Sequence, residues 1–207
     1  MLFSIMDAFK KLLSVAETLL GPDGCPWDKQ QTLLTLQPYL LEEAHELIEA
    51  IDAQDSQKMK EELGDVLYTV IFIAKLAEQE KMFTLFDALD SIAEKMIRRH
   101  PHIFGETKVE GAEDVVRNWE EIKKKEGRKN IFEGIPPTLP ALSRAQKVVS
   151  KLQRKKVLIP TSPTLKTERE LADRLWDLVK EAESMGLDAE SVLRRFCMAR
   201  EKENTGD

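Results

Sequence analysis

Two pairs of acidic residues with i, i+3 spacing are the strongest chemical signal in this sequence. Glu43 and Glu46 lie in LEEAHELIEAI, and Glu62 and Asp65 lie in KEELGDVLYTVIFIA. Residues three apart share one face of a helix, so each pair would present both carboxylates on the same side. A helical wheel places Glu43 inside the edge of one apolar arc and Glu62 beside Ile73 in the other. Two helices packed through these arcs would therefore direct four carboxylates at one spot.

Such a cluster of carboxylates predicts a bound cation. Like charges this close repel strongly unless a cation lies among them. Oxygen-only ligation selects a hard cation, and a few carboxylates together with substrate phosphates are the usual arrangement for Mg²⁺. An ordinary solvated helix face is the alternative for one isolated pair. Two pairs in the same phase, on adjacent predicted helices, favour a metal site that processes phosphates.

Composition limits the classes of function. A chain of 207 residues suggests one or two domains. Its formal charge of −6, with 33% charged residues, argues against general attraction to nucleic acid. Cys25 and Cys197 are far apart and form no CxxC pair, which predicts reduced thiols in a cytoplasmic protein and no zinc site. We expect no membrane span, and charges at amphipathic spacing in the first 20 residues predict a helix there and no targeting segment.

Helical periodicity runs through almost the whole chain, so the elements that position these residues are predicted to be helices. The predicted helices cover residues 3–20, 29–36, 38–53, 56–80, 84–100, 112–127, 139–154, 167–184 and 188–203. We expect an all-α helical bundle with a smaller helical C-terminal tail. The predicted domains are 1–126 for the main domain, 127–138 for a proline-containing linker and 139–207 for the tail.

Several motifs resemble one known family when they are taken in order. EExxE from Glu42 to Glu46 is followed by ExxD from Glu62 to Asp65. Around them stand GCPWDKQQT, IRRHPHIFG, NWEEIKKKE and IPPTLPALSRAQK. In this combination the chain resembles the MazG-type nucleoside triphosphate pyrophosphohydrolases, an all-α family, over about residues 6–153.

The resemblance implies hydrolysis of a nucleoside triphosphate between its α and β phosphorus atoms. If the metal ligands of the family are assigned to the matching positions of this sequence, the residues that would bind Mg²⁺, or Mn²⁺ in its place, are Glu43, Glu46, Glu62 and Asp65. Glu42 would lie near the attacking water as a general base, and its alternative is a plain surface acid. The metal would neutralise phosphate charge and lower the pKa of a bound water.

Basic and aromatic side chains are the predicted substrate-binding groups. Lys95, Arg98 and Arg99 end the helix predicted over 84–100, where they could grip phosphates or simply solvate a helix end. Two tryptophans, Trp27 and Trp119, could stack on a nucleobase, and core packing is the alternative for both. One turn after Trp119, Lys123 could reach a phosphate, although a surface lysine is the simpler interpretation.

Two further interpretations stay open beside this enzyme. The chain could be specialised for one nucleotide such as dUTP or dCTP, or it could be a helical nucleotide sensor or scaffold without turnover. The resemblance implies a homodimer in either case, and no phosphate-binding glycine loop is present.

The C-terminal tail resembles a shortened second copy of the main domain. At an offset of 108, ELGDVLYTVIFIA aligns with ELADRLWDLVKEA, with five of 13 positions identical. No counterpart of CPWD or EExxE precedes it, so Glu170 and Asp173 lack a partner pair and make a poor Mg²⁺ site. We expect a catalytically inactive tail that contributes packing or dimer contacts through Leu171, Leu175, Leu178 and Phe196.

Overall fold

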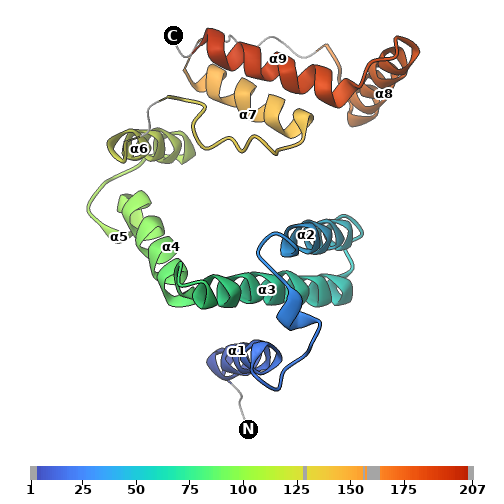
Figure 1. Ribbon diagram of the computed structural model, residues 1–207. Coiled ribbons are helices and arrows are strands. Elements are labelled where there is room, and N and C mark those ends of the chain that lie inside the picture. The colour runs from blue at the N-terminus through green and yellow to red at the C-terminus, as the bar shows by residue number, and fades with distance from the viewer. Residues whose placement is uncertain (1–3, 128–129, 156, 158–163, 205–207) are drawn as a thin grey trace. The chain divides into compact units, whose positions relative to one another are not determined.

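The computed structural model describes residues 4–127, 130–155, 157 and 164–204. Within these ranges the regular elements are helices, which confirms the all-α prediction (Figure 1). The helices are α1 (Ile5–Leu20), η1 (Asp28–Gln30), α2 (Leu36–Asp52), α3 (Ser56–Gln79), α4 (Leu85–Arg99), α5 (Pro101–Phe104), α6 (Ala112–Lys125), α7 (Ala141–Arg154), α8 (Glu168–Ser184) and α9 (Ala189–Glu203).

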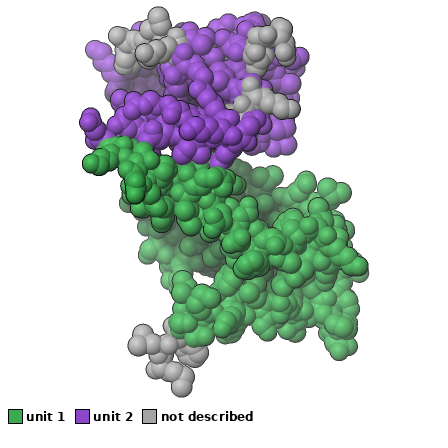
Figure 2. All heavy atoms as spheres, turned by 90° about the vertical axis from the view of Figure 1, so that its left-hand side faces the viewer, with its two compact units in different colours: residues 1–109 green, residues 110–207 purple. Residues whose placement is uncertain are grey.

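The chain divides into two compact units, which Figure 2 shows in different colours. The N-terminal unit comprises Met1–Val109 and the C-terminal unit Glu110–Asp207. These two units are compact regions of the structure. The domain boundaries predicted from the sequence concern functional domains, and they stay a prediction. Each unit is described below by itself.

A tight connection between α2 and α3 brings the two acidic pairs together. Asp55 caps α3 by accepting hydrogen bonds from the backbone N–H groups of Gln57 and Lys58, both at 3.0 Å. The preceding residue, Gln54, has a φ of 54°, a left-handed conformation that reverses the chain within three residues. The two helices therefore pack side by side and run in opposite directions (Figure 1).

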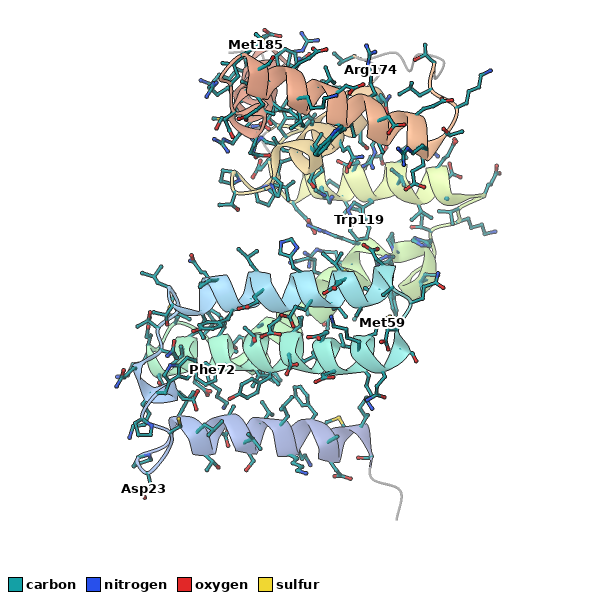
Figure 3. All side chains as sticks on the ribbon, turned by 90° about the vertical axis from the view of Figure 1, so that its right-hand side faces the viewer. Asp23, Met59, Phe72, Trp119, Arg174 and Met185 are labelled. Carbon is teal, nitrogen blue, oxygen red and sulfur yellow. The ribbon has the colours of Figure 1, made fainter. Side chains whose placement is uncertain are left out.

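The core of the N-terminal unit lies where α3 meets α1 and the start of α2. Leu36, Phe72 and Leu76 are its buried residues, and Figure 3 labels Phe72 on α3. Partly buried apolar side chains pack around them: Leu20, Leu33, Tyr68 and Ile73. An ion pair of 2.8 Å between Lys75 of α3 and Glu17 of α1 adds a polar contact. α3 is thus held on one face while its first turns remain available to α2.

Two local predictions of helix differ from the structure. The helix predicted over 29–36 is only the short 3₁₀ turn η1, because Thr32 and Thr35 bond to each other instead of continuing it. The backbone N–H of Thr32 donates to the Thr35 hydroxyl at 2.8 Å, and that of Thr35 to the Thr32 hydroxyl at 3.2 Å. After α4 ends near His100, Pro101 begins the single-turn α5, which was not predicted because one turn is too short to show helical periodicity.

In the C-terminal unit, α7 and α9 lie side by side (Figure 1). The guanidinium of Arg144, which is 6% exposed, donates two hydrogen bonds to the Glu201 carboxylate, at 3.0 and 2.8 Å. The same side of α7 carries Val148 and Leu152, which are buried with Phe132 and Ile135. This second core ties the segment before α7 to the helix itself.

α8 has no buried residue, although its apolar side chains were expected to pack or to form dimer contacts. The side chains named in that prediction are 36–59% exposed within this chain: Leu171, Leu175, Leu178 and Phe196. Packing within the single chain therefore does not cover them, and their role in dimer contacts stays a prediction.

Candidate metal centre

The symmetry of the α2–α3 connection explains how the acidic pairs meet. Counting from Gln54 at the reversal, Glu46 lies eight residues before and Glu62 eight residues after. Glu43 and Asp65 each lie eleven residues from the same point. In an antiparallel helix pair, equal distances from the turn place residues at the same level. Each acid of α2 is thereby set opposite an acid of α3.

Three of these carboxylates converge. Glu43, Glu62 and Asp65 each offer a carboxylate oxygen, and these oxygens lie within 4.8 Å of one another. Glu62 is only 6% exposed, Glu43 is half-buried and Asp65 is exposed. The group thus combines one buried carboxylate, Glu62, with one that is exposed to solvent, Asp65.

Glu46 stands just outside this group of three but interacts with it. Its carboxyl is close enough to that of Glu62 to influence the ionisation of that group. The pKa of Glu62 is raised, first by burial and then by the nearby charge of Glu46. Lys58 opposes this rise, although its ammonium group pairs directly with Glu49 at 3.0 Å.

The pKa of Glu43 is raised as well. Burial is the largest cause, followed by the charges of Asp65, Glu46 and Glu42. Both carboxyls therefore resist ionisation together in the protein alone. A cation bound among them would remove this resistance, because opposite charge favours the ionised form.

The donor set fits a hard divalent cation. Every contributing atom is a carboxylate oxygen, and this type of ligand suits Mg²⁺ or Mn²⁺. The histidine of the same helix, His45, is exposed and does not belong to the group. Three of the four carboxylates predicted from helical spacing thus lie together, and the role of all four as metal ligands stays a prediction.

The predicted base, Glu42, is an exposed neighbour of this cluster. Its charge is one of the causes that raise the pKa of Glu43, so the two carboxyl groups interact electrostatically. The side chain is accessible to water on the open side of α2.

Lys95, Arg98 and Arg99 come from the last two turns of α4. Lys95 and Arg99 are half-buried and Arg98 is exposed. α4 follows the C-terminal end of α3, whereas Glu62 and Asp65 lie in the first three turns of α3. The basic and acidic side chains therefore belong to the same unit but to separate stretches of it.

The aromatic side chains lie in different units. Trp27, in the N-terminal unit, is 54% exposed and meets Tyr39 edge to face, with ring centroids 6.0 Å apart. Trp119 belongs to α6 in the C-terminal unit, and the ammonium of Lys123 lies 5.4 Å from its ring centroid. Lys123 also pairs with Glu120 at 3.6 Å. Trp27 is thus open enough to contact a ligand, while Lys123 covers the ring of Trp119.

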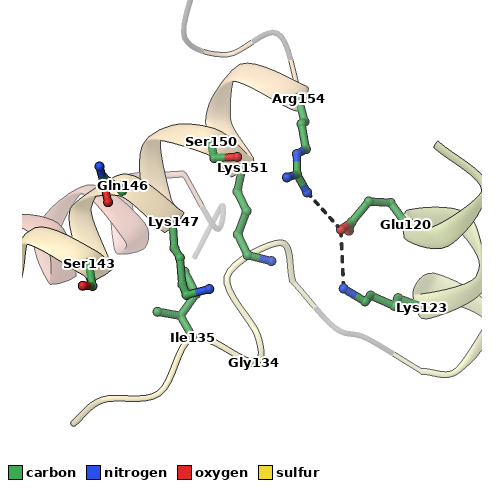
Figure 4. Close-up of a pocket in the computed structure, with 10 residues that line it drawn as sticks. All are labelled: Glu120, Lys123, Gly134, Ile135, Ser143, Gln146, Lys147, Ser150, Lys151 and Arg154. Carbon is green, nitrogen blue, oxygen red and sulfur yellow. Dashed lines mark ion pairs between the residues drawn. The ribbon is translucent and has the colours of Figure 1, made fainter. Parts of the chain in front are cut away.

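One group of basic residues was not singled out from the sequence. Lys147, Lys151 and Arg154 of α7 line a pocket in the C-terminal unit together with Lys123 (Figure 4). A signal was present, because α7 contains four basic residues and no acidic one. Only the folded chain brings Lys123 to the same place.

Comparison with known proteins places this geometry in a family context. Residues 31–104, which contain the acidic cluster, match the model of the MazG nucleotide pyrophosphohydrolase domain. The chain is 38% identical to the nucleoside triphosphate pyrophosphohydrolase/pyrophosphatase MazG of Thermotoga maritima, over 90% of this chain and 80% of that protein. The crystal structure of a mazG-related protein from T. maritima superposes with a TM-score of 0.50 and 32% identity. That likeness covers 56% of this chain and 98% of the other.

A further relative is longer. The chain is 48% identical over 143 residues to an uncharacterized protein of Bacillus subtilis, YabN. The match covers 68% of this chain but only 29% of YabN. The same sequence region therefore occurs within a larger protein in that organism. Among the residues that the structure describes, no helix is long and apolar enough to cross a membrane.

Proposed function

Because the chain belongs to the MazG nucleotide pyrophosphohydrolase family, we propose that it hydrolyses nucleoside triphosphates to nucleoside monophosphates and pyrophosphate. The observation that carries this proposal is the convergence of Glu43, Glu62 and Asp65 within the segment that matches the family. A cluster of several carboxylates near a single lysine, Lys58, suits a reaction in which a cation and a polyphosphate are bound together.

The proposed cofactor is Mg²⁺, with Mn²⁺ as a substitute. The residues proposed to hold it are Glu43, Glu46, Glu62 and Asp65. When bound, the ion supplies positive charge to the phosphates and lowers the pKa of a bound water. The raised pKa values of Glu43 and Glu62 support this role, since they record repulsion that a cation would relieve.

Glu42 is proposed as the general base. It would accept a proton from the water that attacks the α phosphorus. A new P–O bond forms to that water oxygen while the bond to the oxygen bridging the α and β phosphorus atoms breaks. The bridging oxygen keeps the electron pair and leaves as part of pyrophosphate. The exposure of Glu42 beside Glu43 supports this assignment, because the base must reach both water and the cluster.

Lys95, Arg98 and Arg99 are proposed to bind the triphosphate, and Lys123 to add a further phosphate contact. A guanidinium group can donate hydrogen bonds to two phosphate oxygens at once, and this would orient the triphosphate for attack. Trp27 and Trp119 are proposed to stack on the base. The 54% exposure of Trp27 supports its share of that role.

We also propose that the protein acts as a cytoplasmic homodimer and binds no nucleic acid. On α3, Leu63, Leu67 and Val70 are 43–50% exposed and occupy one face beside the acidic cluster. A second copy covering this face would remove apolar surface from water and could bring further basic side chains to the cluster. The net charge of −6 disfavours a nucleic-acid partner.

Product analysis tests the proposal directly. The protein is incubated with each of the common NTPs and dNTPs plus Mg²⁺, and the products are separated by ion-exchange chromatography. We expect ATP to give AMP and pyrophosphate with no ADP, because the attack at the α phosphorus releases pyrophosphate as one unit. ADP and orthophosphate as first products would contradict the proposal. Turnover of one nucleotide alone, such as dUTP, would favour the specialised relative, and no turnover of any would favour the sensor or scaffold.

A further inference from the structure

A pocket of about 500 Å³ lies within the C-terminal unit, and among its lining residues only Lys123 has a role in the proposed function. α6, the segment around Gly134 and Ile135, and one face of α7 form its walls (Figure 4). Gly134 has a φ of 83°, the left-handed conformation that favours glycine, and this lets the chain turn below α7. The pocket is therefore built by three segments and is not a single exposed helix face.

The charge of the pocket is strongly positive. Four basic side chains line it, against one carboxylate: Lys123, Lys147, Lys151 and Arg154, with Glu120. This is a local excess of positive charge in a protein whose net charge is −6. Arg144 does not line it, and its guanidinium is paired with Glu201 of α9.

The basic residues of the pocket that belong to α7 lie close together on its surface. Lys147 and Lys151 are spaced i, i+4, and Lys151 and Arg154 are spaced i, i+3. Like charges at these spacings repel one another across a helix surface. Acidic residues at neighbouring positions would relieve the repulsion, but α7 contains none. An anion bound in the pocket would relieve it in their place.

Glu120 neutralises only part of this charge. Its carboxylate is shared between Arg154 at 3.5 Å and Lys123 at 3.6 Å, the two ion pairs drawn in Figure 4. Both distances are longer than those of a charge-assisted hydrogen bond. Lys147 forms no ion pair with another residue in the part of the chain that the structure describes. Among the residues that line the pocket, one carboxylate therefore stands against four basic side chains.

The size and lining of the pocket define the ligand. From Lys147 to Arg154 the helix rises about 10 Å, so the cations are spread over more than a single phosphate can cover. Serine and glutamine side chains add hydrogen-bond donors between them: Ser143, Gln146 and Ser150. Ile135 is the one large apolar residue of the lining, and no aromatic ring is available for a base. We propose that this pocket binds the phosphate chain of a di- or triphosphate.

Titration calorimetry on the metal-free protein tests this site apart from the proposed hydrolysis. Pyrophosphate or tripolyphosphate is titrated into the protein, and the part of the binding that depends on Lys147 and Lys151 reports the pocket, because the basic side chains of α4 could also bind these anions. Replacing both lysines, Lys147→Gln with Lys151→Gln, should weaken pyrophosphate binding by about tenfold or more, since two charged contacts are lost. Orthophosphate should bind more weakly than pyrophosphate to the wild type.

Matched variants exclude a general charge effect. Lys10→Gln with Lys11→Gln removes the same charge from exposed positions on α1 and should leave pyrophosphate affinity unchanged. Lys147→Arg with Lys151→Arg keeps the charge and should retain binding. Failure of the wild type to bind pyrophosphate, or equal affinity in the Lys147→Gln, Lys151→Gln variant, would overturn the proposal.

A further titration identifies the molecule that carries the phosphate chain. A non-hydrolysable triphosphate analogue is titrated with and without saturating pyrophosphate. Competition between the two would identify the pocket as a site for the triphosphate chain of a nucleotide. Binding of pyrophosphate alone would identify it as a site for the free reaction product. Both results support the phosphate-chain site, and both are independent of turnover.

Discussion

At the scale of single residues, the ionised carboxylate of Glu62 lowers the stability of the folded protein, although it would contribute to the proposed binding of a cation. A carboxylate that is 6% exposed, faces other acids and has only Lys58 as a nearby cation destabilises the protein when it is ionised. Neutral glutamine at such a position would relieve repulsion without changing the shape of the side chain. The proposed binding of a cation would account for charges that folding alone does not favour.

A ligand substitution tests this view. Glu43→Gln, and separately Asp65→Asn, should lower the rate of triphosphate hydrolysis by about 100-fold or more, because even residues that only support a metal ligand cost 10–100-fold. The thermal midpoint of the metal-free variant should equal or exceed that of the wild type, since repulsion is reduced. Added Mg²⁺ should raise the midpoint of the wild type more than that of either variant. Near-native rates in both variants would remove the site assignment.

The basic residues of α4 make a separate prediction. Lys95→Ala and Arg98→Ala should weaken triphosphate binding and slow the reaction, because each removes positive charge that the transition state would use. Steady-state kinetics with the preferred nucleotide give both effects, and Lys60→Ala on the exposed surface of α3 serves as the control. Unchanged kinetics in both α4 variants would make these side chains an ordinary solvated helix end.

At the scale of elements, helix caps set where the chain turns. Asp188 begins α9 by accepting a hydrogen bond of 2.6 Å from the backbone N–H of Ser191. Hydrogen bonds from Ser191 lower the pKa of this carboxyl below its ordinary value of 3.8. The unfolded chain therefore binds this proton more readily than the folded protein does. Its contribution to stability is present above about pH 4 and is lost as the pH falls through the lower pKa of the folded state.

Asp188→Asn isolates this contribution, because asparagine keeps an acceptor oxygen but does not titrate in this range. At pH 6 the wild type should have the higher thermal midpoint, since a negative charge favours a helix N-terminus. The difference should shrink as the pH is lowered from 4 toward 3. Thermal unfolding followed by circular dichroism measures both, and a difference that is constant from pH 6 to pH 3 would contradict the assigned pKa direction.

α8 carries a second test at this scale. The two acids that align with Glu62 and Asp65 are engaged locally: Glu170 accepts a hydrogen bond from the backbone N–H of Lys166 at 2.7 Å, and Asp173 pairs with Arg169 at 3.0 Å. Glu170→Gln with Asp173→Asn should therefore leave the hydrolysis rate unchanged. A large loss of rate, with fold and assembly intact by circular dichroism and light scattering, would show that the second copy takes part in catalysis.

At the scale of the whole molecule, the C-terminal unit contributes a core of its own. Val148 and Leu152 of α7 bury Phe132 and Ile135, which precede that helix. The exposed apolar residues of α8 give the same unit a surface that a second copy could cover. Both features concern stability and assembly.

Deletion of residues 139–207 should therefore change assembly and stability more than chemistry. The truncated chain leaves Phe132 and Ile135 without their partners and removes α8, so we expect a lower thermal midpoint or a smaller oligomer. The rate per folded subunit at saturating nucleotide should fall much less than it does in the Glu43→Gln variant. Light scattering and kinetics on the same sample give the comparison, and loss of all turnover in a folded, fully assembled truncation would contradict it.

The sequence by itself determined the helices and the acidic cluster. Periodicity placed α2 and α3 within two residues of their ends, and i, i+3 spacing set each pair of acids on one face. Because Gln54 stands midway between the two pairs, a short reversal was enough to bring them together. These features depend on local spacing, and local spacing is visible in a sequence.

Only the tertiary structure decided the features that depend on contacts between distant segments. The threonine hydrogen bonds that replace a helix after η1, the exposure of α8 and the meeting of Lys123 with Lys147 and Lys151 leave no periodic trace. Amphipathic spacing tells which face of a helix is apolar, but not whether another segment covers it. Whether a segment covers a helix face depends on how all parts of the chain pack together. In this protein α3 has a buried face, whereas α8 has no buried residue.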